Sequence, residues 1–288
     1  MTHKCHWASS LLAVAVVAAA VAPESGAGEP DERWPMAVQA YTFRHYTLFE
    51  AIDMAAAMGL KYIEAYPGQR FRPDQDITFS HDIGAQERQA LKAHLDDSGV
   101  RLIAYGVVGL GPGQVPFTGD EAFARKVFDF AADMGVDIIS AYPDPTSFDL
   151  LDKLVAEYGI RIGIHNSGPV SHYSRTEDTL GFLENRHRYI GACVDTGIRI
   201  QVGEAPHESI RALGRRVISV HLKDWRHEGE EQIVGEGDMD LKKTATALDE
   251  IGFDGPIILE LELDPEDPLP GATQGLRNWR AALAELRK

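Results

Sequence analysis

Strand-like apolar runs alternate with amphipathic stretches along most of this chain, and that rhythm limits the folds open to it. The runs lie near 36–43, 61–66, 101–108, 137–142, 160–165, 190–196, 216–222 and 256–262. The amphipathic stretches lie at 47–59, 85–98, 119–134, 147–158, 176–186, 205–214, 240–251 and 274–287. The runs are β-branched or aliphatic, as parallel strands buried on both faces are. Eight strand–helix units over about 255 residues predict an α/β fold, a single (β/α)₈ TIM barrel at 36–288.

Glycines mark the expected ends of the helices. They are Gly59, Gly99, Gly135, Gly159, Gly214 and Gly252. Glycine is common directly after a helix because it adopts the left-handed conformation there. A doubly wound open sheet is the alternative architecture, but the first strand is not followed by a glycine-rich phosphate turn. No linker divides the chain, which favours one catalytic domain.

The first 27 residues have the composition of a secretory signal peptide. Lys4 precedes an apolar run at 11–22, and Ser25-Gly26-Ala27 resembles a cleavage site between small residues. The run is short for a membrane span, although an uncleaved anchor is the alternative. Residues 28–35 then form a polar leader. We therefore expect a secreted or periplasmic protein that is not bound to a membrane after cleavage.

Cysteine content and charge exclude several classes of protein. After cleavage only Cys193 remains, so no internal disulfide can form and the domain relies on its core. The net charge is −16, from 28 basic and 44 acidic residues. No basic patch is visible in the sequence, which argues against nucleic acid and anionic membranes as partners.

Four successive strand-like runs end in side chains that bind metals. These side chains are His165, Asp195, His221 and Glu260. Parallel strands in a barrel bring their C-terminal ends to one rim. Two imidazoles and two carboxylates suit one divalent ion, for which Mn²⁺, Co²⁺, Mg²⁺ and Zn²⁺ remain candidates.

Side-chain alternation along these strands supports an inward orientation of the four groups. The residues two positions earlier share their face: Gly163, Cys193, Ser219 and Ile258. The opposite face carries aliphatic residues for the helix layer: Ile162, Ile164, Val194, Val220, Leu222, Leu259 and Leu261. Burial of four ionisable groups is costly unless they are paired or bind an ion. The alternative is a hydrogen-bonded polar core with an Asp195–His221 pair.

Four short motifs give the chain a family resemblance. They are Val-Asp-Thr-Gly (194–197), His-Leu-Lys-Asp (221–224), Gly-Glu-Gly-Asp (235–238) and Ile-Leu-Glu (258–260). Together they resemble the xylose-isomerase-like sugar phosphate isomerase/epimerase family over essentially all of 36–287. The resemblance implies a metal-dependent barrel whose ligands lie on strands five to eight, with Asp195, His221 and Glu260 at ligand positions. It also implies that Lys223 contacts substrate oxygens.

Two positions depart from the family pattern. His165-Asn166 stands where a Glu-Asn pair is common, and Ile198 stands where the Asp-Thr-Gly motif often continues with His. Family epimerases use two ligand glutamates, one to remove and one to return a proton. A metal-bound imidazole is a poor base, so a two-base epimerisation is compromised unless Glu64 or Glu262 substitutes. A one-base elimination or hydration is not compromised.

These arguments favour a 3-keto-glycoside 1,2-lyase or hydratase. Export makes a phosphorylated sugar a poor substrate, and no concentrated phosphate cradle stands out in the sequence. The run Glu64-Ala65-Tyr66-Pro67-Gly68, together with His165-Asn166, resembles a secreted lyase and hydratase branch of the family. The expected partner is therefore a small-molecule sugar or keto-glycoside.

The sequence suggests further roles around the ion. Glu64, Glu260 and Lys223 are candidate catalytic residues, with Glu64 as an additional acid or base. Candidate substrate-binding residues are Tyr41, Tyr66, Tyr105, Trp225, Glu262 and His172. The aromatic rings offer stacking faces to a sugar, and His172 could donate a proton to a leaving group.

Other functions remain open at this point. An isomerase or epimerase acting on a non-phosphorylated sugar would use the same metal and the same barrel. A non-catalytic sugar-binding barrel would bind without turnover. An abasic-site endonuclease on this barrel would need several metals and a basic groove, which the charge opposes. The sequence leaves the oligomeric state open, a homo-oligomer included.

Overall fold

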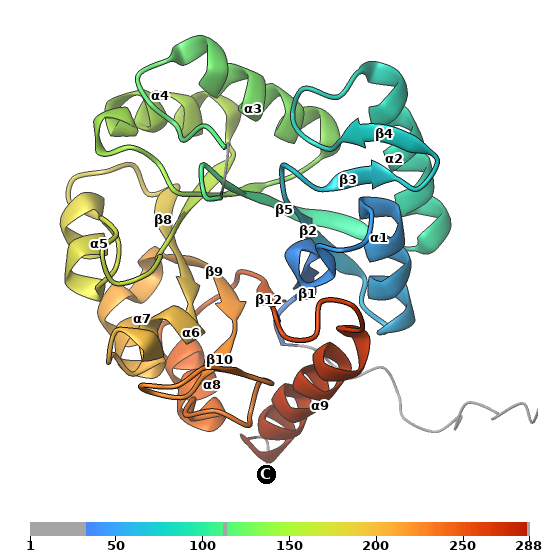
Figure 1. Cartoon of the computed structure of the whole chain (residues 1–288). Helices are drawn as coiled ribbons and strands as arrows, with labels where there is room; N and C mark the ends of the chain where they lie inside the picture. The colour runs from blue at the N-terminus through green and yellow to red at the C-terminus, as the bar shows by residue number, and fades with distance from the viewer. Residues whose placement is uncertain (1–32, 112–113, 287–288) are drawn as a thin grey trace, which may run out of the picture. The chain divides into compact units, whose positions relative to one another are not determined.

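Parallel strands close into a barrel in the computed structural model, which describes residues 33–111 and 114–286. The barrel strands are β1 (Met36–Gln39), β2 (Tyr62–Ala65), β5 (Arg101–Val108), β6 (Ile138–Ala141), β7 (Arg161–His165), β8 (Ile190–Asp195), β9 (Val217–Leu222) and β12 (Ile257–Leu259). They follow one another around the ring in chain order, and β12 pairs with β1 to close it (Figure 1). The predicted TIM barrel is confirmed.

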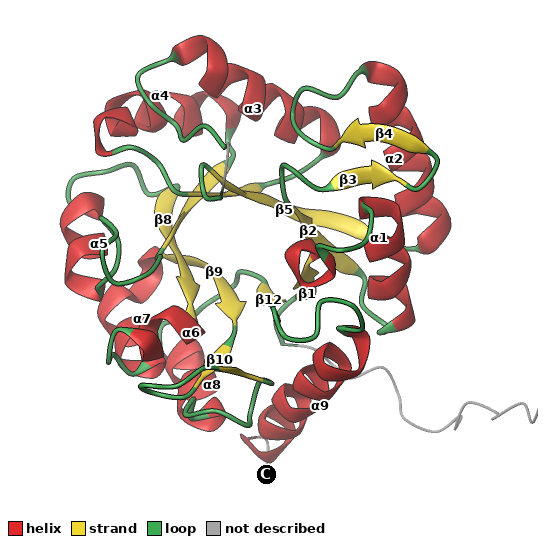
Figure 2. Ribbon diagram, viewed as in Figure 1, coloured by secondary structure: helices red, strands yellow, loops and turns green. Residues whose placement is uncertain are grey.

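Helices surround this ring of strands (Figure 2). They are α1 (Leu48–Ala57), α2 (Ala85–Ser98), α3 (Glu121–Met134), α4 (Phe148–Tyr158), α5 (Thr176–Leu183), α6 (Thr196–Gln201), α7 (Pro206–Leu213), α8 (Leu241–Glu250) and α9 (Leu269–Leu286). Helix α1 begins with a capping box, in which Thr47 and Glu50 satisfy each other's backbone N–H groups. Helices α2, α3 and α4 end at glycines with positive φ, as predicted.

Two expected elements differ from the structure. The first strand was predicted at 36–43, but β1 ends at Gln39 and a 3₁₀ helix (Ala40–Phe43) follows, capped by the Gln39 side chain. The last strand was predicted at 256–262, but β12 ends at Leu259, so Glu260 lies one residue beyond it. The short helix α6 was not predicted, because six residues carry too little periodicity to identify a helix.

The predicted division between inward and outward faces is confirmed for the last strands. Ile162, Val194 and Val220 are fully buried in the large apolar cluster. Ala37, Ala104 and Ile258 belong to a separate, smaller apolar cluster. Burying this surface supplies the folding free energy that a domain without disulfides needs.

The loops that follow β2 and β9 contain small hairpins. Strands β3 (Arg70–Arg72) and β4 (Gln75–Thr78) pair after β2, and β10 (Asp224–Trp225) pairs with β11 (Glu231–Gln232) after β9. The Asp224 carboxylate accepts the backbone N–H groups of Trp225, Gly235, Gly237 and Met239 at 2.9–3.0 Å. One buried carboxylate therefore organises the whole 225–239 loop, which contains the Gly-Glu-Gly-Asp motif.

Among the described helices, none has the length and apolarity that crossing a membrane requires. The predicted signal peptide and most of the predicted polar leader lie outside the described residues.

Candidate metal centre and substrate cavity

The four predicted metal ligands lie together at one end of the barrel. His165 ends β7, Asp195 ends β8, His221 lies in β9 and Glu260 follows β12. These strands are neighbours in the sheet, and Asp195 pairs directly with His221. One ligand atom from each residue lies within 4.8 Å of the others, and all four side chains are buried.

Glu64 determines how His221 faces this cluster. The Nε2–H group of His221 donates to Glu64 Oε2 at 2.7 Å, and both side chains are fully buried. That bond leaves Nδ1 directed toward Glu260 Oε2 at 2.9 Å and His165 Nε2 at 3.2 Å. A carboxylate behind a histidine ligand fixes the ring and its tautomer. His221 therefore presents Nδ1 as the atom that would bind an ion.

The electrostatics of the cluster fit a divalent cation. Burial, with His221 next to it, lowers the pKa of His165 to about 3, so this imidazole is neutral and keeps a lone pair. Burial opposes charge on His221 as well, but Cys193 and Glu64 beside it raise its pKa well above the ordinary value. Positive charge is thus favoured among these acids, and a divalent cation would supply it. His165, Asp195, His221 and Glu260 would hold it.

Hydrogen bonds between side chains and the backbone fix the strand ends that carry the candidate ligands. The Asn166 amide donates to Asp195 O at 3.0 Å and accepts from Asp195 N at 2.8 Å. Thr196 Oγ1 bonds the backbone of Lys223, the residue directly after β9, accepting from its N–H and donating to its carbonyl. Gly197 leaves room for this approach, since a Cβ there would lie 2.8 Å from Lys223 Cβ. The Val-Asp-Thr-Gly motif therefore fastens β8 to β9.

Asp195 also caps a helix. Its Oδ1 accepts the Ile198 N–H at 2.9 Å at the start of α6, while Oδ2 lies 3.7 Å from His165 Nε2. Burial raises its pKa to about 6, although Lys223 opposes that shift. The Asp195 carboxylate therefore has two roles: it caps α6 and it belongs to the cluster of candidate metal ligands.

A cavity of about 650 Å³ opens above the cluster. Of the four candidate ligands, His165, Asp195 and Glu260 line it. Other polar lining residues are Gln39, Arg44, Gln114, Ser167, Lys223 and Glu262. The volume lies within the ~300–1,000 Å³ range of small-molecule sites, and a wall that combines polar side chains with apolar surface suits a sugar, which has both hydroxyl groups and C–H faces.

Lys223 lies among carboxylates at the edge of the cluster. It hydrogen-bonds Glu262, and its Nζ lies 3.5 Å from Glu260 and 3.9 Å from Glu231. Burial disfavours the ammonium form, but Glu260, Asp195 and Glu262 outweigh it and hold the pKa of Lys223 well above its ordinary value. Lys223 is therefore a charged hydrogen-bond donor at the cavity wall.

The structure brings some predicted substrate residues to the cavity. Tyr41, Tyr66 and Glu262 line it, and the two tyrosine rings pack edge to face with their centroids 5.1 Å apart.

Four predicted catalytic or substrate residues lie outside the lining. Tyr105 is fully buried against Phe130, and its hydroxyl bonds His81. Trp225 turns to its own hairpin and donates to Gly229 O at 3.2 Å. His172 is exposed on a loop, and Glu64 is buried behind His221. Tyr105 and Glu64 lie deeper than expected because a strand pattern gives the face of a residue but not its depth, and the positions of Trp225 and His172 depend on loop conformations that the sequence does not reveal.

Sequence reasoning missed several residues of the site, and three of them make buried or short contacts there. Gln39 is buried in the cavity wall and donates to Gly106 O at 3.1 Å. Arg44 lies over the Tyr41 ring and donates to Glu262 O at 2.7 Å. Glu231 accepts the Glu262 N–H at 3.0 Å, and burial raises its pKa to about 7. Gln39 ends the first strand and Arg44 follows it by five residues, so their position near the strand end was the signal available in the sequence.

Comparison with known proteins agrees with this geometry. The sequence profile of the family described as Xylose isomerase-like TIM barrel matches residues 52–287. Inosose dehydratase of Lactiplantibacillus plantarum is 25% identical over 137 residues, which cover 41% of this chain and 45% of that protein. The alignment therefore spans about half the length of that curated relative.

Solved structures share the fold over most of the chain. A putative uncharacterized protein from Parabacteroides distasonis is 25% identical, with a TM-score of 0.67, and the match covers 88% of this chain and 99% of that one. D-psicose 3-epimerase from Clostridium cellulolyticum, solved with D-tagatose, is 14% identical with a TM-score of 0.66, covering 86% and 99%. The second likeness concerns the fold alone.

Proposed function

Since the chain belongs to the xylose isomerase-like TIM barrel family, we propose that it is a sugar-active enzyme that removes a proton next to a carbonyl group. Its specific reaction would be 1,2-elimination from a 3-keto-glycoside, or the reverse hydration. The observation that carries this proposal is the cluster of His165, Asp195, His221 and Glu260 under a polar cavity. The relative named a dehydratase also supports elimination.

The chain's own residues can bind the substrate and move the proton. A divalent ion in the cluster would polarise the substrate's carbonyl oxygen and acidify the adjacent C–H. Glu260 is the candidate base, because it lines the cavity as a carboxylate: burial opposes its charge, but Lys223 lowers its pKa and keeps it deprotonated, free to accept a proton. Lys223 can donate to a substrate oxygen as charge develops there. Tyr41 and Tyr66 offer apolar ring surface to the sugar.

His165 supports elimination over two-base epimerisation. It lies 3.2 Å from His221 inside the ligand cluster, as a neutral imidazole, where the family pattern often has glutamate. With one base, Glu260 takes the C2 proton, the C1–O bond breaks, and the departing oxygen is protonated from solvent. The products are a 3-keto sugar with a 1,2 double bond and a free alcohol. Addition of water across that bond would complete a hydratase cycle.

The test is release of a coloured aglycone. We expect the Mn²⁺-loaded protein to release 4-nitrophenol from 4-nitrophenyl 3-keto-glucoside, and Glu260→Gln to lower kcat/KM by about 10²–10⁴-fold, the usual contribution of a general base. The matched control substrate is 4-nitrophenyl glucoside without the keto group, whose C2–H is not acidic. Equal turnover of both substrates would refute elimination.

A sugar isomerase or epimerase is the second candidate. The observation that favours it is a second carboxylate, Glu262, which lines the same cavity beside Lys223. In D₂O an epimerase would incorporate deuterium into a free ketose while its carbon skeleton remains intact. Metal-dependent exchange on free sugars without aglycone release would decide for this candidate.

The proposed place of action is outside the cytoplasm. The support is the sequence at 1–27, with Lys4, an apolar run and small residues before position 28. N-terminal sequencing of the protein recovered from the periplasm or medium should begin close to Gly28. A chain that retains Met1 and stays in the cytoplasm would contradict export.

A further inference from the structure

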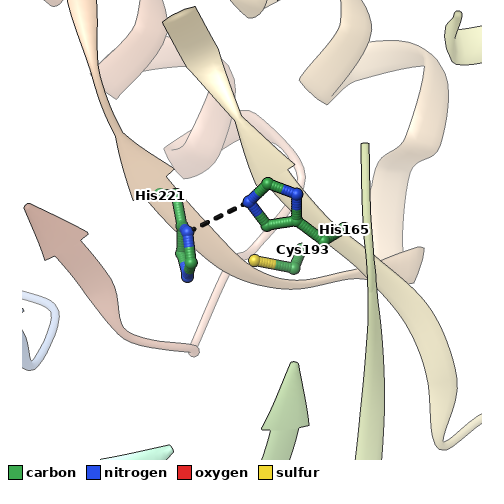
Figure 3. A group of neighbouring side chains, drawn as sticks. All are labelled: His165, Cys193 and His221. Carbon is green, nitrogen blue, oxygen red and sulfur yellow. Dashed lines mark hydrogen bonds between the residues drawn. The ribbon is translucent and has the colours of Figure 1, made fainter. Parts of the chain in front are cut away.

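The two histidines of the metal cluster also face a cysteine. His165, Cys193 and His221 each place a ligand atom within 4.8 Å of the other two, and all three are buried. Figure 3 shows the Cys193 side chain beside both rings, with its sulfur directed toward His221. The strand register explains the position of Cys193, because this residue pairs with His165 on β7 and with Ser219 on β9.

The surroundings of the thiol leave polar atoms without partners. Ser219 Oγ and His165 Nδ1 are buried and make no hydrogen bond among the described residues. Gly163 on β7 packs closely against Cys193 and Ser219. A Cβ at position 163 would lie 3.1 Å from Cys193 Cβ and 3.3 Å from Ser219 Oγ, so the strands leave little room there for a side chain. Cys193 itself is a free cysteine, so no disulfide competes for its sulfur.

The two possible ligand sets differ in chemical softness. His165 and His221 with Asp195 and Glu260 offer nitrogen and oxygen, which suit Mn²⁺ or Mg²⁺. The same histidines with Cys193 offer nitrogen and sulfur, which thiophilic ions select. Because both sets need the same imidazoles, an ion in one set excludes an ion from the other.

We propose that His165, Cys193 and His221 form a second, mutually exclusive site for a thiophilic divalent ion such as Zn²⁺ or Cd²⁺. On binding, the Cys193 S–H bond breaks, the proton passes to solvent, and sulfur bonds the ion without a change of oxidation state. A thiophilic ion would thereby displace the harder ion from its histidines. This inference concerns ion selection and stands whether or not the proposed sugar chemistry is correct.

The experiment follows the metal–sulfur bond directly. Cys5 is the other cysteine in the sequence, so every protein carries Cys5→Ser. Cd²⁺ titration of this parent should produce the ultraviolet charge-transfer band of a cadmium thiolate, saturating at one ion per chain. Added Cys193→Ser should abolish the band and weaken Cd²⁺ binding by more than the ~10–100-fold typical of losing an outer-shell partner. Mn²⁺ affinity should change far less.

Competition decides between one shared pair of histidines and two independent sites. Cd²⁺ should release bound Mn²⁺ one for one, followed by the electron paramagnetic resonance signal of free Mn²⁺. Cys193→Ala serves as a second variant, and circular dichroism confirms that each variant is folded. A band that persists without Cys193, no band in the parent, or simultaneous binding of both ions would each overturn the proposal.

Discussion

One carboxylate on β2 controls how the ligand His221 is presented. Glu64 and His221 are 157 residues apart in the sequence. The 2.7 Å bond from Glu64 to His221 Nε2 leaves His221 Nδ1 facing the cluster. Glu64 Oε1 has no hydrogen-bond partner among the described residues, so this carboxylate is committed to the histidine alone. We infer that Glu64 positions His221 and does not exchange protons with substrate.

Glu64→Gln should therefore weaken metal binding. The amide is nearly isosteric but carries no charge to orient the imidazole, so we expect about 10–100-fold lower Mn²⁺ affinity. Isothermal titration calorimetry measures it. The control is Glu266→Gln, because Glu266 is an exposed carboxylate that contacts His45 and no ligand. Equal affinities of Glu64→Gln and the parent would remove the positioning role.

The cluster of candidate metal ligands was predictable from the sequence, and the side chains that support it were not. His165, Asp195, His221 and Glu260 lie at or next to the C-terminal ends of strands, and a parallel barrel gathers such ends at one rim. The contact between Glu64 and His221 spans the barrel interior between strands that are not neighbours in the sheet. Sequence alternation gives the face of each residue, whereas barrel twist and depth decide which inward side chains meet.

At the scale of elements, helix caps and loop hydrogen bonds fix the backbone around the substrate cavity. The capping box of α1 joins Thr47 and Glu50 just after the cavity residues Arg44 and His45. Its main contacts are Thr47 N to Glu50 Oε2 at 2.8 Å and the Thr47 hydroxyl to the same oxygen at 2.7 Å. The start of α1 is therefore fixed beside the substrate cavity.

Thr47→Ala should destabilise the fold by about 1 kcal/mol, the usual cost of losing an N-cap.

Glu50→Gln should lower the stability of the fold less at acid pH than at neutral pH. The Thr47 backbone N–H lowers the pKa of Glu50 below 4.5, so the charged Glu50 stabilises the folded state above that pH, and this stabilisation is lost as pH falls through the pKa of the folded state. Urea unfolding at neutral and acid pH measures it, and a deficit that grows at low pH would contradict the assignment.

Asp224→Ala should loosen the 225–239 loop. Four backbone N–H groups would lose their acceptor, and the buried one, of Met239, would cost about 1–3 kcal/mol if it stayed unpaired, whereas water can reach the other three. Hydrogen exchange should accelerate at Gly235, Gly237 and Met239 before the barrel opens. Glu236→Ala, an exposed change in the same loop, is the control and should leave those rates unchanged.

Element positions were predicted better than element ends. The eight strands follow from buried aliphatic runs, but β1 stops early because Gln39 caps a 3₁₀ turn. Helix α6 and the two hairpins escaped notice because their helix and strands are only 2–6 residues long. They depend on individual side-chain contacts, such as Asp195 with Ile198 N at the start of α6 and Asp224 with the backbone of the 225–239 loop. Such contacts leave no periodic signal.

At the scale of the molecule, folding brings the candidate metal ligands together. The ring closes where β1 pairs with β12, through Met36 and Ile257, and Trp34 donates to Phe253 O beside that seam. The ligands lie on β7, β8 and β9 and just after β12, so they meet only when the barrel is closed. An ion that binds the folded barrel alone stabilises it by mass action.

Mn²⁺ at about 100 times its Kd should raise Tm by roughly 5–10 °C, from ~2.7 kcal/mol of binding free energy and ~2–4 °C per kcal/mol for a domain of this size. Calorimetry with Mn²⁺ and then with excess chelator measures the shift and its reversal. His221→Ala should show no Mn²⁺-dependent shift. A similar increase in that variant would place the ion elsewhere.

The two oxygens of Asp195 restrict how this barrel could be redesigned. One oxygen is held by the first turn of α6 and the other faces His165. A substitution at this position would remove both the cap at the start of α6 and a candidate ligand of the ion. Directed evolution toward a new substrate should therefore leave position 195 unchanged and accumulate its changes at rim residues such as His45, which is half exposed.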